Sequence, residues 1–355
     1  MSALFKQFLS FVRKEFIHIL RDKVTILILL VLPLILIGLF GFALTTELKE
    51  SRVLVVDQMQ DEMSSALIQT IHANHYFDVT NVLQDSRNAE DCMKEGEADV
   101  VLLLDPSLGI QILADASEPN QAQSRIVYLT QILTPLLSEQ SGNGLVSTRM
   151  LFNPQLKSEY NFVPGVIGLV ILLICSLMTS LSIVREKEMG TMEILLASPL
   201  PPITIIVAKL IPYFTVSSIN VVNILLMSRF ILGIPISGSV ATFLLISIVY
   251  IFVSLALGLL ISIVANSQLV AMLLSLLLIV PGLYLSGMIF SIESMPVVFQ
   301  RISTIVPMRW YVDATKRLLI QGVEFQYVVK DLWVLFVEAV VLIGISLKIF
   351  KTRLE

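Results

Sequence analysis

The stretch VATFLLISIVYIFVSLALGLLISIV, residues 240–264, decides the fold class. It contains no charged side chain, and it exceeds the roughly 20 apolar residues that a helix needs to cross the hydrocarbon core of a bilayer. Lipid offers no hydrogen-bond partners to the backbone, so only a helix or a closed barrel can span it. A run of this length therefore predicts a transmembrane helix.

Five further apolar runs lead to the same interpretation. They cover residues 24–45, 162–184, 203–228, 268–290 and 332–350. The composition agrees, because 55% of the 355 residues are hydrophobic, only 15% are charged, and the mean hydropathy is +0.85. The sequence predicts an α-helical integral membrane protein with six transmembrane helices and an inserted extracytoplasmic α/β domain.

The composition also excludes some functions. A net charge of -4 and a pI near 5.5 give no electrostatic basis for binding nucleic acid. The two cysteines, Cys92 and Cys175, fall in a polar segment and in a predicted span, so they are not expected to pair with each other. No metal site is predicted.

Basic residues beside the short loops set the predicted orientation. They precede the first run, follow the second and close the last: Lys6, Arg13, Lys14, Arg21, Lys23, Arg185, Lys187, Lys348, Lys351 and Arg353. Both termini are therefore expected in the cytoplasm of a bacterial cell, with the spans in its inner (plasma) membrane. Segment 291–330 is also basic, although the number of predicted spans places it on the extracytoplasmic side. Either the charge rule does not hold for this segment, or one span is miscounted.

The polar parts of the chain have their own patterns. Residues 1–23 have apolar side chains at helical spacing, typical of an amphipathic interfacial helix. Residues 46–161 alternate apolar runs with helical patterns, which predicts strands at 52–57, 77–83, 98–104 and 109–113 and helices at 64–75, 89–96 and 121–137. We expect this segment to form the small extracytoplasmic α/β domain.

A short amphipathic segment follows the second predicted span. It reads REKEMGTMEILLASPL, residues 185–200, and its prolines disfavour helix at the residues before them. On a helix over 185–197, Met189 and Met192 share one face while Glu186 and Glu193 share the other. Such a helix on the cytoplasmic side is suited to docking a soluble partner.

This motif, together with KRLLIQG at 316–322, resembles the type-2 class of ABC transporter permeases, in the multidrug, sodium and polysaccharide export branch. The resemblance implies a permease subunit of an ATP-driven exporter that moves a drug, lipid or other small substrate across the inner membrane. It also implies two ABC ATPase subunits, a second permease copy or paralogue, and surrounding membrane lipid as partners. The residues implied to contact the ATPase are Glu186, Lys187, Glu188, Met189, Gly190, Thr191, Met192 and Glu193.

ATP is expected to be handled by another chain. The sequence contains no G-x-x-x-x-G-K-[ST] motif, whose backbone amides and lysine would cradle the phosphates. We therefore predict no enzymatic activity, no catalytic residue and no cofactor for this chain, with ATP and Mg bound by the partner subunit.

Polar side chains within the predicted spans are costly in lipid, so they are candidates for a translocation pathway. They are Ser176, Thr179, Ser180, Asn220, Asn223 and Glu338. The alternative for the hydroxyls and amides is hydrogen bonding between helices. The resemblance further implies short re-entrant helices in 291–330, where Trp310 and Tyr311 suit a membrane-interface belt.

Two other functions stay open at this point. In a membrane-anchored sensor or scaffold, the 46–161 domain would bind a ligand and the spans would only tether it. An ion-driven secondary transporter would show internal repeats with paired broken helices. Co-purification separates the three, because only the exporter requires a stoichiometric ATPase.

Overall fold

The computed structural model describes residues 3–42, 51–85, 92–93, 97–106, 109–114, 119–140, 159–191 and 201–354. The chain divides into two compact units, one comprising Met1–Leu44 with Ser158–Glu355 and the other comprising Thr45–Lys157. Each unit has its own hydrophobic core.

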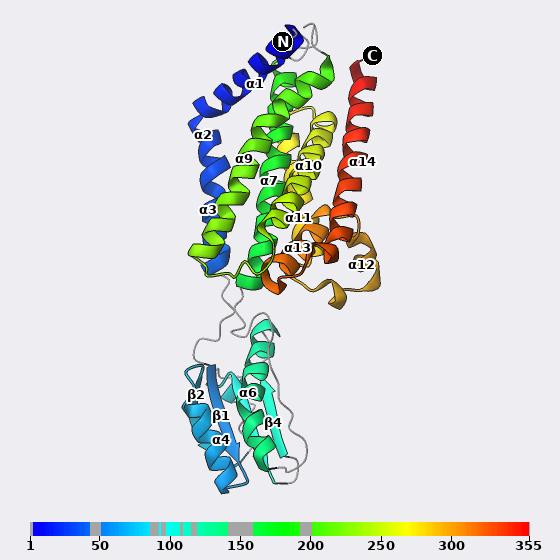
Figure 1. Ribbon diagram of the computed structural model, residues 1–355. Coiled ribbons are helices and arrows are strands. Elements are labelled where there is room, and N and C mark those ends of the chain that lie inside the picture. Colours follow the sequence, from blue (N-terminus) through cyan, green and yellow to red (C-terminus); the bar gives the residue numbers. More distant parts are fainter. Residues whose placement is uncertain are drawn as a thin grey trace. The chain divides into compact units, whose positions relative to one another are not determined.

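The larger unit is a bundle of helices (Figure 1). In the described part of the chain, five helices are long and apolar enough to cross a membrane. They are α7 (Glu159–Glu188), α9 (Pro202–Phe230), α10 (Val240–Val264), α11 (Gln268–Leu285) and α14 (Val329–Leu354). Four of them contain a predicted apolar run in full, whereas α11 ends at Leu285, before the end of the predicted run 268–290. The prediction of a mostly helical membrane protein is confirmed.

The first predicted span, residues 24–45, is not among these five helices. It forms α2 (Lys23–Ile26), a π-helical turn (Leu27–Val31) and α3 (Leu32–Phe42), and its last residues lie outside the described ones. Nδ2 of Asn220 in α9 donates to the carbonyl oxygen of Leu29 at 2.7 Å, which gives this irregular turn a buried partner. A sixth span stays a prediction.

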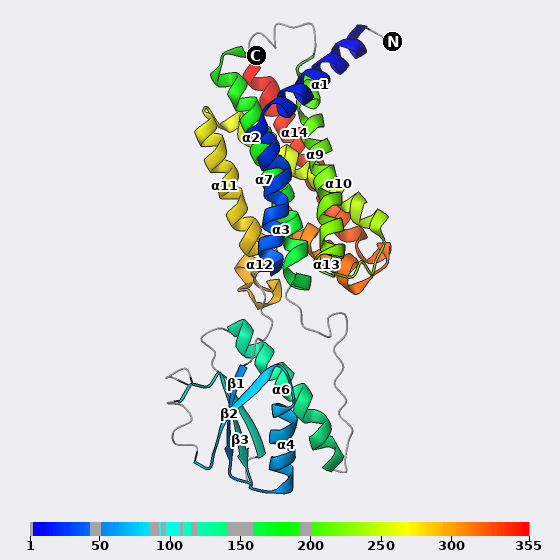
Figure 2. The ribbon, with the colours of Figure 1, turned by 90° about the vertical axis from the view of Figure 1, so that its left-hand side faces the viewer.

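Helix α7 is the centre of the bundle. It contacts α3, α9, α10, α11 and α13 (Pro307–Lys316), and in Figure 2 α3 runs beside it. In its most apolar stretch 78% of the residues are buried, against 17% for α11 and for α14. At Gly258 of α10 a Cβ atom would lie 2.7 Å from the carbonyl oxygen of Ser176, so α7 and α10 approach closely there. Movement of α7 would therefore reach most of the bundle.

The segment between α11 and α14 is largely helical. It contains a 3₁₀ turn (Ile292–Ser294), α12 (Val297–Ser303), α13, a π-helical turn (Arg317–Gln321) and a second 3₁₀ turn (Phe325–Tyr327). The expected interfacial position of Tyr311 is wrong. Its side chain is fully buried, stacks on Tyr250 at 4.4 Å between ring centroids and shares a 2.9 Å hydrogen bond with Ser247.

The smaller unit contains a four-stranded sheet in the order β2-β1-β3-β4. The strands are β1 (Ser51–Asp57), β2 (Phe77–Leu83), β3 (Val100–Asp105) and β4 (Gly109–Ala114). β1 pairs in parallel with β2 and β3, and β4 is antiparallel to β3. Helices α4 (Glu62–His72) and α6 (Pro119–Gln140) cover one face of the sheet, as Figure 2 shows. The predicted helix at 89–96 lies mostly outside the described residues.

Helix α1 (Ala3–Arg21) lies within the segment 1–23, where an amphipathic interfacial helix was expected. Val12, Glu15 and Ile19 are buried, with α1 packed on α9. Phe5 and Leu9 are exposed. One of the three buried side chains is thus a carboxylate, which needs a cationic partner in the bundle.

Candidate functional site

The expected coupling segment begins inside the last turn of α7. That helix continues to Glu188, because no helix breaker interrupts residues 184–188. The chain then leaves the helical path at Gly190, which has a left-handed φ of 67°. The hydroxyl of Thr191 then donates to the carbonyl oxygen of Glu186 at 3.2 Å. The predicted start of a separate helix at 185 is therefore wrong. Residues 192–197, including Met192 and Glu193, lie outside the described residues.

Two neighbouring charged residues bind this end of α7 to the adjoining ends of α10 and α11. Nζ of Lys187 donates to the carbonyl oxygens of Ser262 and Ala265, at the carboxyl end of α10. The Glu188 carboxylate accepts hydrogen bonds from the backbone and side-chain nitrogens of Gln268, the first residue of α11. A cation at a helix C-terminus and an anion at a helix N-terminus both interact favourably with the helix dipole. We call this pair of residues the α7 clamp.

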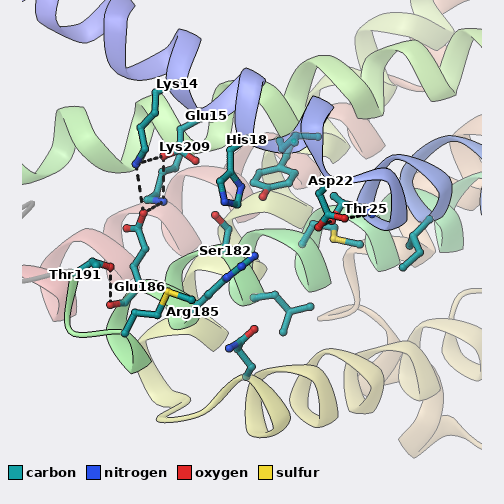
Figure 3. A pocket seen from close by; sticks show the side chains of 17 residues that line it. Lys14, Glu15, His18, Asp22, Thr25, Ser182, Arg185, Glu186, Thr191 and Lys209 are labelled. Atoms are coloured by element: carbon teal, nitrogen blue, oxygen red, sulfur yellow. Dashed lines mark hydrogen bonds and ion pairs between the residues drawn. The ribbon is translucent and has the colours of Figure 1, made fainter.

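A buried lysine holds α1, α7 and α9 together. Nζ of Lys209 in α9 lies 2.7 Å from Oε1 of Glu186 and 3.5 Å from Oε1 of Glu15. Lys209 is 3% exposed, whereas Lys14, which completes the cluster at 3.3 Å from Glu15 and 3.9 Å from Glu186, is largely exposed. Figure 3 shows these side chains converging from three helices. We call these four residues the Lys209 cluster.

The Lys209 cluster forms one wall of a cavity of about 500 Å³. The cavity is lined by residues from α1, α2, α7, α9 and α11, including His18, Asp22, Ser182 and Arg185 (Figure 3). Asp22 caps the helix that follows it, since its Oδ1 accepts from the backbone N–H of Thr25 at 3.3 Å, and its Oδ2 accepts from the Thr25 hydroxyl at 2.7 Å. The cavity is therefore a meeting point of the interfacial helix, the end of α7 and the α11 N-terminus.

The predicted partner-contact residues are thus in unlike environments. Glu186, expected on a docking face, is tied to Lys209, and its Oε2 is buried without a hydrogen-bond partner among the described residues. Lys187 and Glu188 bind the α10–α11 loop. Met189 is 60% exposed and Gly190 is exposed as well, so the surface accessible to a partner begins at the C-terminal end of α7.

Most of the polar residues predicted within spans bind other helices or their own helix. Oγ of Ser176 donates to Leu172 O at 2.6 Å, and Oγ of Ser180 lies 3.1 Å from Oγ of Ser275 in α11. Asn220 binds the Leu29 carbonyl, as described above. Thr179 packs against Gly258, although its Oγ1 is buried without a hydrogen-bond partner among the described residues. Helix packing therefore accounts for these four.

The other two predicted polar residues are only half-buried. Asn223 is half-buried on α9. Glu338 is half-buried on α14, and its Oε2 is buried with no hydrogen-bond partner in the described part of the chain. Neither Asn223 nor Glu338 lines the cavity beside the Lys209 cluster, and the structure does not bring them together with the other four predicted residues in a described cavity.

Sequence reasoning missed Lys209 and Glu15, although a signal was present. Lys209 is a lone cation within the apolar run 203–228, and a charge inside a span calls for a partner. The described residues contain no group of three or more metal-ligating side chains.

Comparison with known proteins agrees with this architecture. Residues 23–348 match the family described as ABC-2 family transporter protein. The chain is 31% identical over 365 residues to the probable multidrug ABC transporter permease YbhS of Escherichia coli, covering 96% of each chain. It is 30% identical over 352 residues to the probable multidrug ABC transporter permease YbhR of the same organism, covering 94% of this chain and 95% of the relative.

A more distant relative has the same region within a longer protein. ABC transporter G family member 20 of Dictyostelium discoideum is 24% identical over 347 residues, which are 91% of this chain and 47% of the relative. The match to the family profile extends over most of the chain, and the similarity to YbhS and YbhR runs nearly end to end. The chain belongs to the ABC-2 family and is an ABC transporter permease.

Proposed function

We propose that this chain is the membrane-spanning subunit of an ATP-driven exporter and that a separate nucleotide-binding subunit hydrolyses the ATP. The observation that carries the proposal is the match of residues 23–348 to the ABC-2 family in a sequence without a phosphate-binding loop. The cargo is a drug, lipid or other small substrate, in keeping with the multidrug permeases that the chain resembles. ATP and Mg then belong to the partner subunit.

The proposed membrane arrangement follows from the basic residues near the helix ends. The chain crosses the inner membrane six times, with both termini and the α7 end in the cytoplasm. The sheet-containing unit, Thr45–Lys157, is placed outside. A second permease copy or paralogue completes the pathway together with two ATPase subunits. The near-equal identities to YbhS and YbhR favour neither a homodimer nor a heterodimer.

The proposed coupling route starts at residues 188–193. Exposed Met189 offers an adaptable apolar contact for the ATPase, and the residues that follow the break at Gly190 complete the docking surface. A push there reaches α10 and α11 through the α7 clamp, since Lys187 and Glu188 bind the ends of both helices. Glu186 transmits the same push to α1 and α9 through Lys209.

The proposed translocation pathway uses the two predicted polar residues that are only half-buried in the bundle. Glu338 carries an unpartnered carboxyl oxygen on α14, and Asn223 is accessible on α9. We assign these two residues to the pathway surface and Ser176, Thr179, Ser180 and Asn220 to the packing that shapes it.

ATP hydrolysis tests the division of labour. The purified chain should release no phosphate above a buffer control, because it has no loop to cradle the nucleotide. Hydrolysis should appear when the chain is reconstituted with an ABC ATPase subunit that co-purifies with it, and a Walker-lysine variant of that ATPase is the control. Turnover by the isolated chain, free of contaminating ATPase, would refute the proposal.

A further inference from the structure

A second polar cavity lies at the end of the bundle where α7 begins, opposite the end where α7 terminates at Glu188. Its volume is about 510 Å³, and it is enclosed by the start of α7, the turn after α11, α13 and the first residues of α14. It shares no lining residue with the cavity beside Lys209. The charges in its wall decide what it can bind.

Several of these charges are already engaged within the protein. Nη2 of Arg317 lies 2.7 Å from Oδ2 of Asp313. Nζ of Lys316 donates to Oδ1 of Asn161 at 2.6 Å and to the carbonyl oxygen of Gly287 at 2.7 Å. Burial lowers the pKa of Lys316 to about 8, with the nearby Asp313 carboxylate opposing the shift. These groups form part of the cavity wall, and their internal contacts make them unavailable to pair with a ligand.

Besides Arg309 and the exposed Glu293, the cavity wall holds one more carboxylate, Asp331, and one more ammonium, Lys330. Asp331 is 2% exposed, and its Oδ2 is buried with no hydrogen-bond partner among the described residues. A buried carboxylate oxygen without a donor is costly, so the site is completed by a donor from outside the chain. Lys330 is exposed, and its ammonium lies over the face of Trp310, at 5.5 Å from the ring centroid. The cavity therefore offers a ligand one buried hydrogen-bond acceptor, Oδ2 of Asp331, and one exposed cation, the ammonium of Lys330.

An apolar surface adjoins this cavity. Arg309, in the cavity wall, donates from Nη1 to the carbonyl oxygen of Gln300 at 2.9 Å and to Oγ of Ser303 at 2.6 Å, which attaches α12. Elsewhere on and just after α12 the apolar side chains are exposed: Val297, Val298, Phe299, Ile302 and Ile305. A polar cavity beside an exposed apolar helix suits an amphiphile with its chains on α12.

We propose that this cavity binds a headgroup carrying both a phosphate and a primary ammonium, that of a phosphatidylethanolamine-type lipid. The ammonium donates to Asp331, and the phosphate accepts from Lys330. The acyl chains lie along the exposed side chains of α12. The proposal does not depend on ATP coupling, since it concerns only the permease in lipid.

Lipid retention tests the headgroup preference. The full chain is purified in detergent with equal amounts of phosphatidylethanolamine, phosphatidylcholine and phosphatidylglycerol, and the retained lipid is counted by native mass spectrometry. We expect about tenfold more phosphatidylethanolamine than either of the others, because only the ethanolamine headgroup offers the buried carboxylate a donor that is also a cation. The choline headgroup has no N–H to donate, and the glycerol headgroup has no cation.

Two variants and one control place the preference at the cavity. Asp331→Asn should reduce it to within about twofold of the other lipids, because it removes the carboxylate that selects the ammonium. Lys330→Gln should instead lower the retention of all three lipids together, because each of them carries the phosphate. Glu324→Gln, at an exposed acid on the same connecting segment that does not line the cavity, should keep the preference. Asp331→Asn should also melt no lower than the parent in lipid-free detergent, because it removes a buried unpaired charge. A lower melting temperature would show a structural role instead.

Soluble phosphoethanolamine separates a lipid from a free phosphorylated amine. At the same concentration as the lipid it should displace little phosphatidylethanolamine, since it lacks the chains that contact α12. Equal competition would overturn the lipid assignment. Equal retention of the three lipids, or a preference that survives Asp331→Asn, would overturn the headgroup site itself.

Discussion

Replacing Lys209 by methionine should destabilise the larger unit by about 3–5 kcal/mol, the cost of removing one partner from a buried ion pair. Lys209 is nearly inaccessible and neutralises Glu15 and Glu186, whose side chains are 7% and 16% exposed. Methionine fills a similar volume but leaves the two carboxylates with only the exposed Lys14 as a cationic neighbour. The loss is measured as a drop in melting temperature and in resistance to denaturant in detergent micelles.

The same cluster supplies the control and the rescue. Lys14→Met removes an exposed lysine from the cluster and should cost at most about 1 kcal/mol. Adding Glu15→Gln and Glu186→Gln to Lys209→Met should recover most of the lost stability, because no buried charge then lacks a partner. Equal effects of Lys14→Met and Lys209→Met would show that the cluster is not buried in the membrane-embedded protein.

Gly258→Val should be the most damaging single substitution at the contact between α7 and α10. Its Cβ atom would lie 2.7 Å from the carbonyl oxygen of Ser176 and 2.9 Å from Cβ of Thr179. A backbone atom cannot swing aside, so the helices must separate, at or above the upper end of the about 1–3 kcal/mol typical of overpacking. The readout is the yield of monodisperse protein on size exclusion, with denaturant resistance as a second measure.

Gly344→Val is the matched control on α14, because a Cβ atom there would meet no heavy atom within 4 Å. It introduces the same β-branched residue into a helix, so it carries the same propensity cost without the clash. We expect near-parental yield. A Gly258→Val protein as stable as Gly344→Val would mean that α7 and α10 are not in close contact.

The apolar runs predicted the helices well because burial in lipid requires long, continuous stretches of apolar residues. Residues 240–264 coincide with α10, for example. The end of α7 was misplaced because hydropathy falls at Arg185 while the helix itself continues until Gly190 takes a left-handed conformation. Polarity marks the predicted edge of a span, whereas backbone geometry marks the end of its helix.

The partners of the charged residues could not be predicted from the sequence. Glu15 and Lys209 are far apart along the chain, and only the packing of α1 on α9 brings them together. Tyr311 shows the same limit from the apolar side. Trp310 and Tyr311 are neighbours of similar type, yet successive helix positions point in different directions, so one is half-buried and the other lies in the core.

Photo-cross-linking from Met189 tests most directly whether the end of α7 is where the ATPase docks. A benzoylphenylalanine placed at this exposed position should cross-link to the ATPase subunit in membranes that contain both proteins. The same probe at Ser65, exposed on α4 in the other unit, should give no such product. An ATPase cross-link from position 65, or none from 189 in a complex that co-purifies, would contradict the proposed docking surface.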